Sequence, residues 1–375
     1  MSGIRASFAA LIPSLSESLS TSLAAIAVAA TTHWLMFTML APFAWRVYLR
    51  LGARRMVFLR GLTTAAGFLM VTVSPGPIGV VVGFGLIAGA GTHGFDTLTR
   101  SVTLVGLHQR ERDRLLALVG SGAPIGTATF PAFTALVLVV GGPRVAAAAA
   151  AVLLLLTTGT AGALLPSRDP EIVAPTGGRR RQPSVWRSRV FLLVALAFRL
   201  ALGAQVAVPV MLPDWVPTIR SADVAIAFLV LDARGLLGRP ALSLPGQAFP
   251  LRLWVVVTAA QAASAGCLLA FHTAGPPSAY IAVALLGGSL QLFGGLFAIA
   301  TLACFPPSLF APVNGSLLVP LGLAGAFATF AFTVAFERGV EPALIWAGLA
   351  LFALTAGALF LIAEFWSPVR RARVG

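Results

Sequence analysis

Charged and titratable side chains inside long apolar runs are the residues of this sequence best placed to do chemistry. Asp96 and Arg100 are four residues apart in one such run, and His93 lies three residues before Asp96. On a helix this spacing puts the three side chains on one side. A charge near the centre of a bilayer costs about 2.5–3.5 kcal/mol, so it usually faces an interior cavity and has a partner. The group predicts either a proton- or substrate-linked cluster or a structural ion pair.

A second set of charges lies in and near the apolar run 222–243. Asp232 and Arg239 are seven residues apart and share a helix face, whereas Arg234 lies roughly opposite Asp232. Arg199, in an earlier run, has no acid three or four residues away and needs a partner on another helix or an anionic ligand. A guanidinium can hold a carboxylate through two parallel hydrogen bonds and stays charged. These arginines are therefore candidate anion-binding residues, and ion pairing with Asp232 or snorkelling is the alternative for Arg234 and Arg239.

The elements that carry these charges are predicted to be membrane helices. The chain has 375 residues, of which 58% are hydrophobic and 10% charged, whereas soluble proteins carry about a quarter charged residues. Eleven apolar runs are long enough to span a bilayer, at residues 19–42, 56–74, 77–103, 115–140, 144–165, 188–212, 222–243, 251–272, 277–304, 308–336 and 342–365. We therefore expect an all-α polytopic membrane protein in which no sizeable domain lies outside the bilayer.

The arginines predict the orientation of these helices. If successive helix ends alternate between the two sides, seventeen arginines fall on one side: Arg46, Arg50, Arg54, Arg55, Arg110, Arg112, Arg114, Arg168, Arg179, Arg180, Arg181, Arg187, Arg189, Arg252, Arg370, Arg371 and Arg373. The other side has Arg144, Arg220 and Arg338. By the positive-inside rule the first set, together with the C-terminus, is cytoplasmic. Glu337 and Glu341 flank a short turn on the opposite side and are expected to be solvated.

The longest polar stretch, residues 167–189, lies near the middle of the chain and divides the runs into two sets. Residues 4–14 are apolar but too short to span, and we count them as part of a first helix. Roughly ten to fifteen apolar residues would then be missing upstream, and we expect a late start codon or a truncated product. Duplicated six-helix units are common in secondary transporters. The predicted divisions are 1–166, an N-terminal bundle with a partial first helix; 167–187, a cytoplasmic linker; and 188–375, a C-terminal bundle.

Several classes of function are disfavoured by the sequence. The net charge is +14, but the basic residues lie in short turns and not in a basic domain interleaved with aromatic residues, so no nucleic-acid partner is expected. Cys267 and Cys304 stand in apolar segments without metal-ligand spacing and are expected to be packing residues. No enzyme site, cofactor site or metal site is predicted.

The turn at residues 41–55, APFAWRVYLRLGARR, resembles the loop between helices 2 and 3 of the major facilitator superfamily, where glycines, an Asp-Arg pair and two basic residues recur. Four residues fit that conformational motif: Arg50, Gly52, Arg54 and Arg55. Trp45 stands where the family has a glycine, and Leu49 where it has the aspartate. Later segments extend the resemblance over nearly the whole chain, including GFGLIAGAGTHG, HQRERDR and GGPR. A faint internal echo links RRMVFLRGLTTAAGFL to LRLWVVVTAAQAASAGCLL about 200 residues later.

Two segments are similar to the monocarboxylate and oxalate/formate branch of this superfamily. The opening IRASFAALIPSLSESLS resembles that branch's first helix, and Arg5 occupies the place of its basic residue. The segment LDARGLLGRPALSLPGQAFPLR resembles its eighth helix, with the Arg-Pro pair at Arg239 and Pro240. In the branch an aspartate lies one turn before that arginine, but Gly235 is found there in this sequence and the acid is Asp232.

The resemblance implies a monomeric twelve-helix carrier of the inner membrane, moving a small mono- or dicarboxylate with protons by alternating access. Candidate substrate-binding residues are Arg5, Arg199, Arg234 and Arg239, and candidate proton-coupling residues are His93, Asp96, Arg100 and Asp232. Two alternatives remain open. One is a proton-coupled exporter of drugs or metabolites, and the other is a transport-inactive membrane scaffold.

Overall fold

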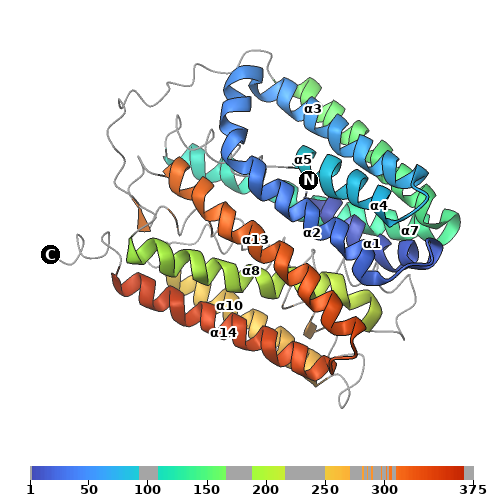
Figure 1. Cartoon of the computed structure of the whole chain (residues 1–375). Helices are drawn as coiled ribbons and strands as arrows, with labels where there is room; N and C mark the ends of the chain where they lie inside the picture. The colour runs from blue at the N-terminus through green and yellow to red at the C-terminus, as the bar shows by residue number, and fades with distance from the viewer. Residues whose placement is uncertain are drawn as a thin grey trace.

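The computed structural model describes residues 2–92, 109–165, 188–215, 250–270 and 310–366, with single positions between 281 and 305. These residues form helices and turns, with no strand among them. The longer helices are α1 (Ser2–Ser18), α2 (Leu23–Leu40), α3 (Ala44–Val73), α7 (Gln109–Leu164), α8 (Arg189–Trp215), α10 (Pro250–Leu269), α13 (Phe310–Glu337) and α14 (Pro342–Trp366). Between α3 and α7 the chain forms α4 (Pro77–Val80), the π-helix η2 (Val81–Ala88) and α5 (Gly89–Thr92). Figure 1 shows the long helices packed in rows.

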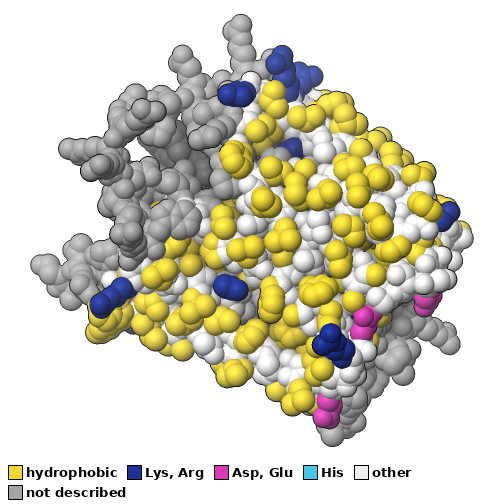
Figure 2. Space-filling view, viewed as in Figure 1, with side chains coloured by type: hydrophobic (Ala, Val, Ile, Leu, Met, Phe, Trp, Pro, Cys, Tyr) yellow, Lys and Arg dark blue, Asp and Glu magenta, His cyan; other side chains and the backbone are white. Residues whose placement is uncertain are grey.

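The surface of these helices is suited to lipid. Six described helices are long and apolar enough to cross a membrane. Large hydrophobic side chains are widely exposed on them, for example Phe327 at 69% and Val140 at 90%. Figure 2 shows a broad hydrophobic face with its acidic side chains at one edge. Because a soluble protein would bury such surface, the apolar exterior confirms the predicted polytopic membrane fold.

Most predicted runs correspond to helices, with two differences at the turns. The turn predicted at 41–55 is largely helical, because α3 begins at Ala44 and bends at Gly52. The runs 115–140 and 144–165 are joined in α7, which is interrupted at Gly142. The short apolar piece 4–14 extends in both directions to form α1. The predicted run 222–243 lies outside the described residues.

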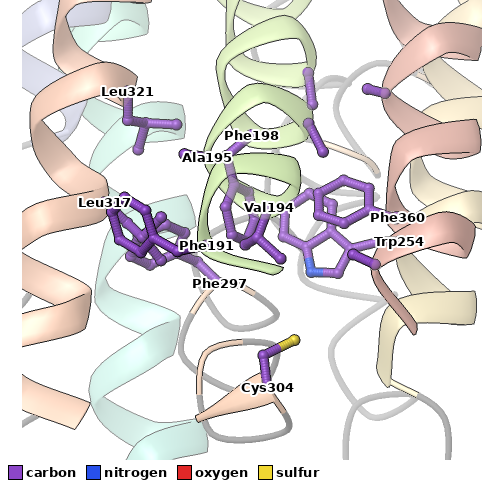
Figure 3. Packing of buried hydrophobic residues seen from close by; sticks show 14 of the residues in the cluster. Phe191, Val194, Ala195, Phe198, Trp254, Phe297, Cys304, Leu317, Leu321 and Phe360 are labelled. Atoms are coloured by element: carbon purple, nitrogen blue, oxygen red, sulfur yellow. The ribbon is translucent and has the colours of Figure 1, made fainter. Parts of the chain in front are cut away.

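Two hydrophobic cores hold the helices together. The first consists of buried residues of helices α1 to α7, from Ile4 to Leu154. The second consists of buried residues from Val190 to Ala363, most of them in α8, α10, α13 and α14. In the second core, Phe198 of α8 meets the Trp254 ring of α10 edge to face at 4.9 Å, and Phe360 of α14 stacks on Trp254, also at 4.9 Å. Figure 3 shows these rings filling the space between the three helices. The predicted linker 167–187 lies outside the described residues, so the division into two halves stays a prediction.

Helices α3 and α10 show the same burial pattern, 197 positions apart. Buried residues of α3 include Val57, Arg60, Gly61, Thr64, Gly67 and Phe68, and their counterparts Trp254, Val257, Thr258, Gln261, Ser264 and Ala265 are buried in α10. A side chain at Gly61 would collide with Thr158 of α7, and a Cβ at Gly357 of α14 would lie 2.7 Å from Thr258 Oγ1. In the first pair the glycine is on α3 and the threonine on α7, whereas in the second pair the threonine is on α10 and the glycine on α14. The faint sequence echo thus corresponds to a repeated packing arrangement.

Replacing Gly357 tests this packing arrangement. Gly357→Val should lower the free energy of unfolding by about 1–3 kcal/mol, because its branched side chain must displace Thr258. Thermal unfolding in detergent measures the loss. The control is Gly348→Val on the same helix, where an added Cβ meets nothing within 4 Å. Equal stability of the two variants would contradict the proposed close contact between α10 and α14.

Candidate functional site

We call the helices of the first core, α1 to α7, the first half and those of the second core, α8 to α14, the second half. The two sets of helices meet along a seam between α2 and α13 (Figure 1). The helices are antiparallel, because contacts that move forward along α2 move backward along α13. Thr31 Oγ1 donates to the Ala326 carbonyl at 3.4 Å, and Thr38 lies against Gly322. Small residues of α13 let the backbones approach, as is usual where helices pack within lipid. This seam is the described region in which residues of both halves come together most closely.

Trp34 is the largest side chain of the seam. A Cβ added at Gly325 would lie 2.9–3.2 Å from three atoms of the indole ring, so the ring packs directly on the α13 backbone. Trp34 also packs against the hydrophobic core of the second half. Trp34 is thus a residue of α2 whose side chain packs largely against the second half.

Arg5 of α1 lies over the same indole ring. Its guanidinium carbon is 4.5 Å from the Trp34 ring centroid and 5.2 Å from that of Phe37. Trp34 and Phe37 are three residues apart on α2, so both rings face α1. A cation over aromatic faces gains about 0.5–2 kcal/mol, more when water is excluded. The predicted basic residue of the first helix is thus half-buried beside the seam.

His33 connects α2 to the π-helix η2 on the other side. Its Nδ1 donates to the Phe84 carbonyl at 3.2 Å, which leaves Nε2 to accept from the Thr92 hydroxyl at 2.9 Å. The His33 ring stacks on Phe84 at 4.5 Å, and Phe84 stacks on Phe8 of α1 at 3.6 Å. π-Helical turns are frequent at functional sites. His33 thus connects α2 to η2 and to α5 through hydrogen bonds at both ring nitrogens.

Arg60 is a buried charge that the sequence reasoning missed. It lies in α3 with 3% exposure, and its Nε donates to the Gly91 carbonyl at 2.8 Å. The signal was present, since Arg60 interrupts the run 56–74, but its nearness to Arg54 and Arg55 hid it among the basic residues of the turn. Arg60 holds the chain two residues before His93, the first member of the predicted charged cluster.

Arg199 occupies the exposed face of α8, together with Leu192 and Leu196. Its neighbours Val194 and Phe198 point the other way, into the second core. Helix α8 packs against α1, so Arg199 and Arg5 come from contacting helices of opposite halves. The remaining candidates His93, Asp96, Arg100, Asp232, Arg234 and Arg239 lie outside the described residues.

The chain matches the family model of the Major Facilitator Superfamily over residues 1–329. The chain belongs to this superfamily. It is therefore a multi-pass membrane transporter whose substrate is a small molecule. No curated protein matches the chain as a relative.

Helix α3 bends at Gly52, a residue of the predicted major facilitator loop motif. Gly52 has φ 73° and ψ 167°, a conformation that disfavours residues with a Cβ. Arg50 before the bend and Arg54 and Arg55 after it are exposed. The glycine of the motif thus fixes the turn, and the arginines around it face outward.

Glu337 joins the two halves of the transporter at the far end of the seam. It ends α13, where a carboxylate is disfavoured by its own helix dipole, and it accepts instead from the Ala24 N–H at 2.8 Å, in the first turn of α2. Ser22 accepts from the next amide, Ala25 N, at 3.1 Å. Glu337 is exposed, as expected from the sequence, but its carboxylate also caps a helix of the other half, a contact that the sequence did not predict.

Removing this cap should weaken the seam. Glu337→Ala should cost about 0.5–2 kcal/mol of unfolding free energy, the usual value of a lost N-cap, and Glu337→Gln should cost less because an acceptor remains. Thermal unfolding in detergent measures both. Glu17→Ala removes an exposed carboxylate from the last turn of α1 and serves as the control. A loss as large for Glu17→Ala would show that charge, not capping, is responsible.

Proposed function

We propose that this major facilitator protein carries a small organic anion, a mono- or dicarboxylate, across the inner membrane together with protons. The observation that carries the proposal is the position of Arg5, a half-buried guanidinium on α1 beside the seam. A half-buried positive charge in a membrane protein requires compensation. Aromatic faces supply part of it and exclude water, which strengthens the attraction of the guanidinium for an arriving anion.

The chemistry of the guanidinium favours a carboxylate as the anion. Its planar fork can make two parallel hydrogen bonds to the two carboxylate oxygens. Arg199 is proposed as a second anion contact, because its guanidinium is exposed and its helix packs against α1. Arg239 and Arg234 remain proposed as further anion contacts, and Asp232, Asp96, His93 and Arg100 as the proton-coupling groups. Alternating access of the two halves would then move the site from one side to the other.

Replacing Arg5 tests the anion site. Loss of one charged hydrogen-bond partner costs about 1.5–3 kcal/mol, so carboxylate uptake by Arg5→Met at low substrate concentration should fall roughly 10- to 150-fold. Arg5→Lys should keep part of the activity, since a point charge cannot make the forked contact. The assay is uptake of labelled mono- and dicarboxylates into proteoliposomes under an imposed pH gradient.

The control for this assay is Arg144→Met, which removes an exposed arginine from the turn within α7. It should leave uptake unchanged. Export of a lipophilic cation without carboxylate uptake would replace the proposal by the drug-exporter alternative. Absence of any flux from folded protein would favour the scaffold alternative.

The proposed orientation places the C-terminus and the Arg-rich turns in the cytoplasm, because seventeen arginines lie on that side and three on the other. A reporter enzyme that is active only outside the cytoplasm, fused after Gly375, should therefore give no signal. The same reporter inserted at Gly339, in the turn between α13 and α14, should be active. The reverse pattern would invert the topology.

A further inference from the structure

One aromatic ring touches both the proposed anion site and the contact between the halves. The Trp34 indole carries the Arg5 guanidinium at 4.5 Å and packs on the backbone of α13 at Gly325. Arg5 and Trp34 belong to α1 and α2 of the first half, whereas Gly325 belongs to the second. Any movement of the indole therefore changes its contacts with both halves.

The fit at Gly325 leaves little freedom for the ring. With only 2.9–3.2 Å between an added Cβ and the ring atoms, no side chain larger than hydrogen is accommodated there without a shift. The ring thus sets the distance between α2 and α13 at this level. Thr31 and Thr38, one turn away on either side, depend on the same separation for their contacts with Ala326 and Gly322.

We propose that Trp34 couples anion binding at Arg5 to the opening of the seam between α2 and α13. This inference rests on the proposed function, since it takes Arg5 as an anion-binding residue. Trp34 is a positioning residue in it and need not touch the anion. A carboxylate that engages the guanidinium competes with the ring for the cation and weakens the cation–π contact. The indole, held in place on one side by Arg5, is then released to rotate away from Gly325.

The energetic requirement for such coupling is modest. A ligand can shift an equilibrium between two conformations only by its difference in affinity for them. Here that difference comes from the cation–π contact, which is present with the seam closed and is given up when the anion binds. A coupling of this size corresponds to roughly a 2- to 30-fold effect of the anion on the open-to-closed ratio.

The test compares the wild type with Trp34→Leu by hydrogen–deuterium exchange, with and without a saturating carboxylate identified in the uptake assay. In the wild type, the carboxylate should increase deuterium uptake in peptides of α2 and α13. In Trp34→Leu the carboxylate should still bind, as followed by its thermal shift, but the change in deuterium uptake should disappear. Proteoliposome uptake by this variant should fall by a similar factor, roughly 2- to 30-fold, as expected when binding no longer drives the transition.

The chain supplies a matched control for the loss of a tryptophan beneath an arginine. Arg189 of α8 lies 5.5 Å from the ring centroid of Trp366 of α14, a similar pair contained within the second half. Trp366→Leu should leave the seam response intact. Trp34→Phe keeps a smaller ring beneath Arg5 and should give an intermediate response, which preserves the test if Trp34→Leu does not fold.

The possible failures are distinguishable. If no carboxylate binds or enters with the wild type, the proposed function fails, and the coupling proposal fails with it. If carboxylates bind to Trp34→Leu or Trp34→Phe and the seam responds as in the wild type, Trp34 is a packing residue and only the coupling proposal is overturned. A response lost equally in Trp366→Leu would also overturn it, since the effect would then be general destabilisation.

Discussion

Close approach of helices at small residues is the interaction on which the rest of this structure depends. Lipid offers helices no hydrophobic reason to associate, so contact must come from packing and hydrogen bonds. The pairs Gly61 with Thr158 and Gly357 with Thr258 provide it within the halves, and Gly325 with Trp34 provides it between them. A transporter must keep the first kind of contact and periodically break the second. The seam accordingly includes a long and therefore weak hydrogen bond, from Thr31 Oγ1 to the Ala326 carbonyl at 3.4 Å.

The charges of this protein are positioned by the same helices, but each is compensated differently. Arg60 is buried against a backbone carbonyl, Arg5 lies over two rings, and Arg199 is exposed on its helix. An arginine can bind an incoming anion only if the anion can replace one of the contacts that stabilise its charge. A guanidinium over aromatic rings meets this condition best, because a cation–π contact is weak enough for a carboxylate to replace it. Arg60, by contrast, is suited to a structural role.

The membrane class and most helix positions could be predicted from the sequence, because the length of an apolar run is a local property. Gly52 was identified from the loop motif, and its positive φ gives the physical reason. The environment of Arg5 could not be predicted, since it depends on Trp34 and Phe37 from another helix. The capping contact of Glu337 could not be predicted for the same reason, because its partner at Ala24 is 313 residues away. Single-sequence patterns carry no information about such pairs.

The π-helix Val81–Ala88 has a consequence for how the following residues are oriented. Its hydrogen bonds span five residues and not four, so each residue turns the chain through a smaller angle than in an α-helix. A helical wheel that assumes α-helical geometry throughout adds up this difference in angle, residue by residue. It therefore places the side chains that follow the π-helix on the wrong face. The four residues Gly89–Thr92 of α5 keep their spacing among themselves but are rotated as a group relative to those before Val81. The wider turns therefore decide which direction Thr92 faces, and with it whether its hydroxyl reaches the His33 ring.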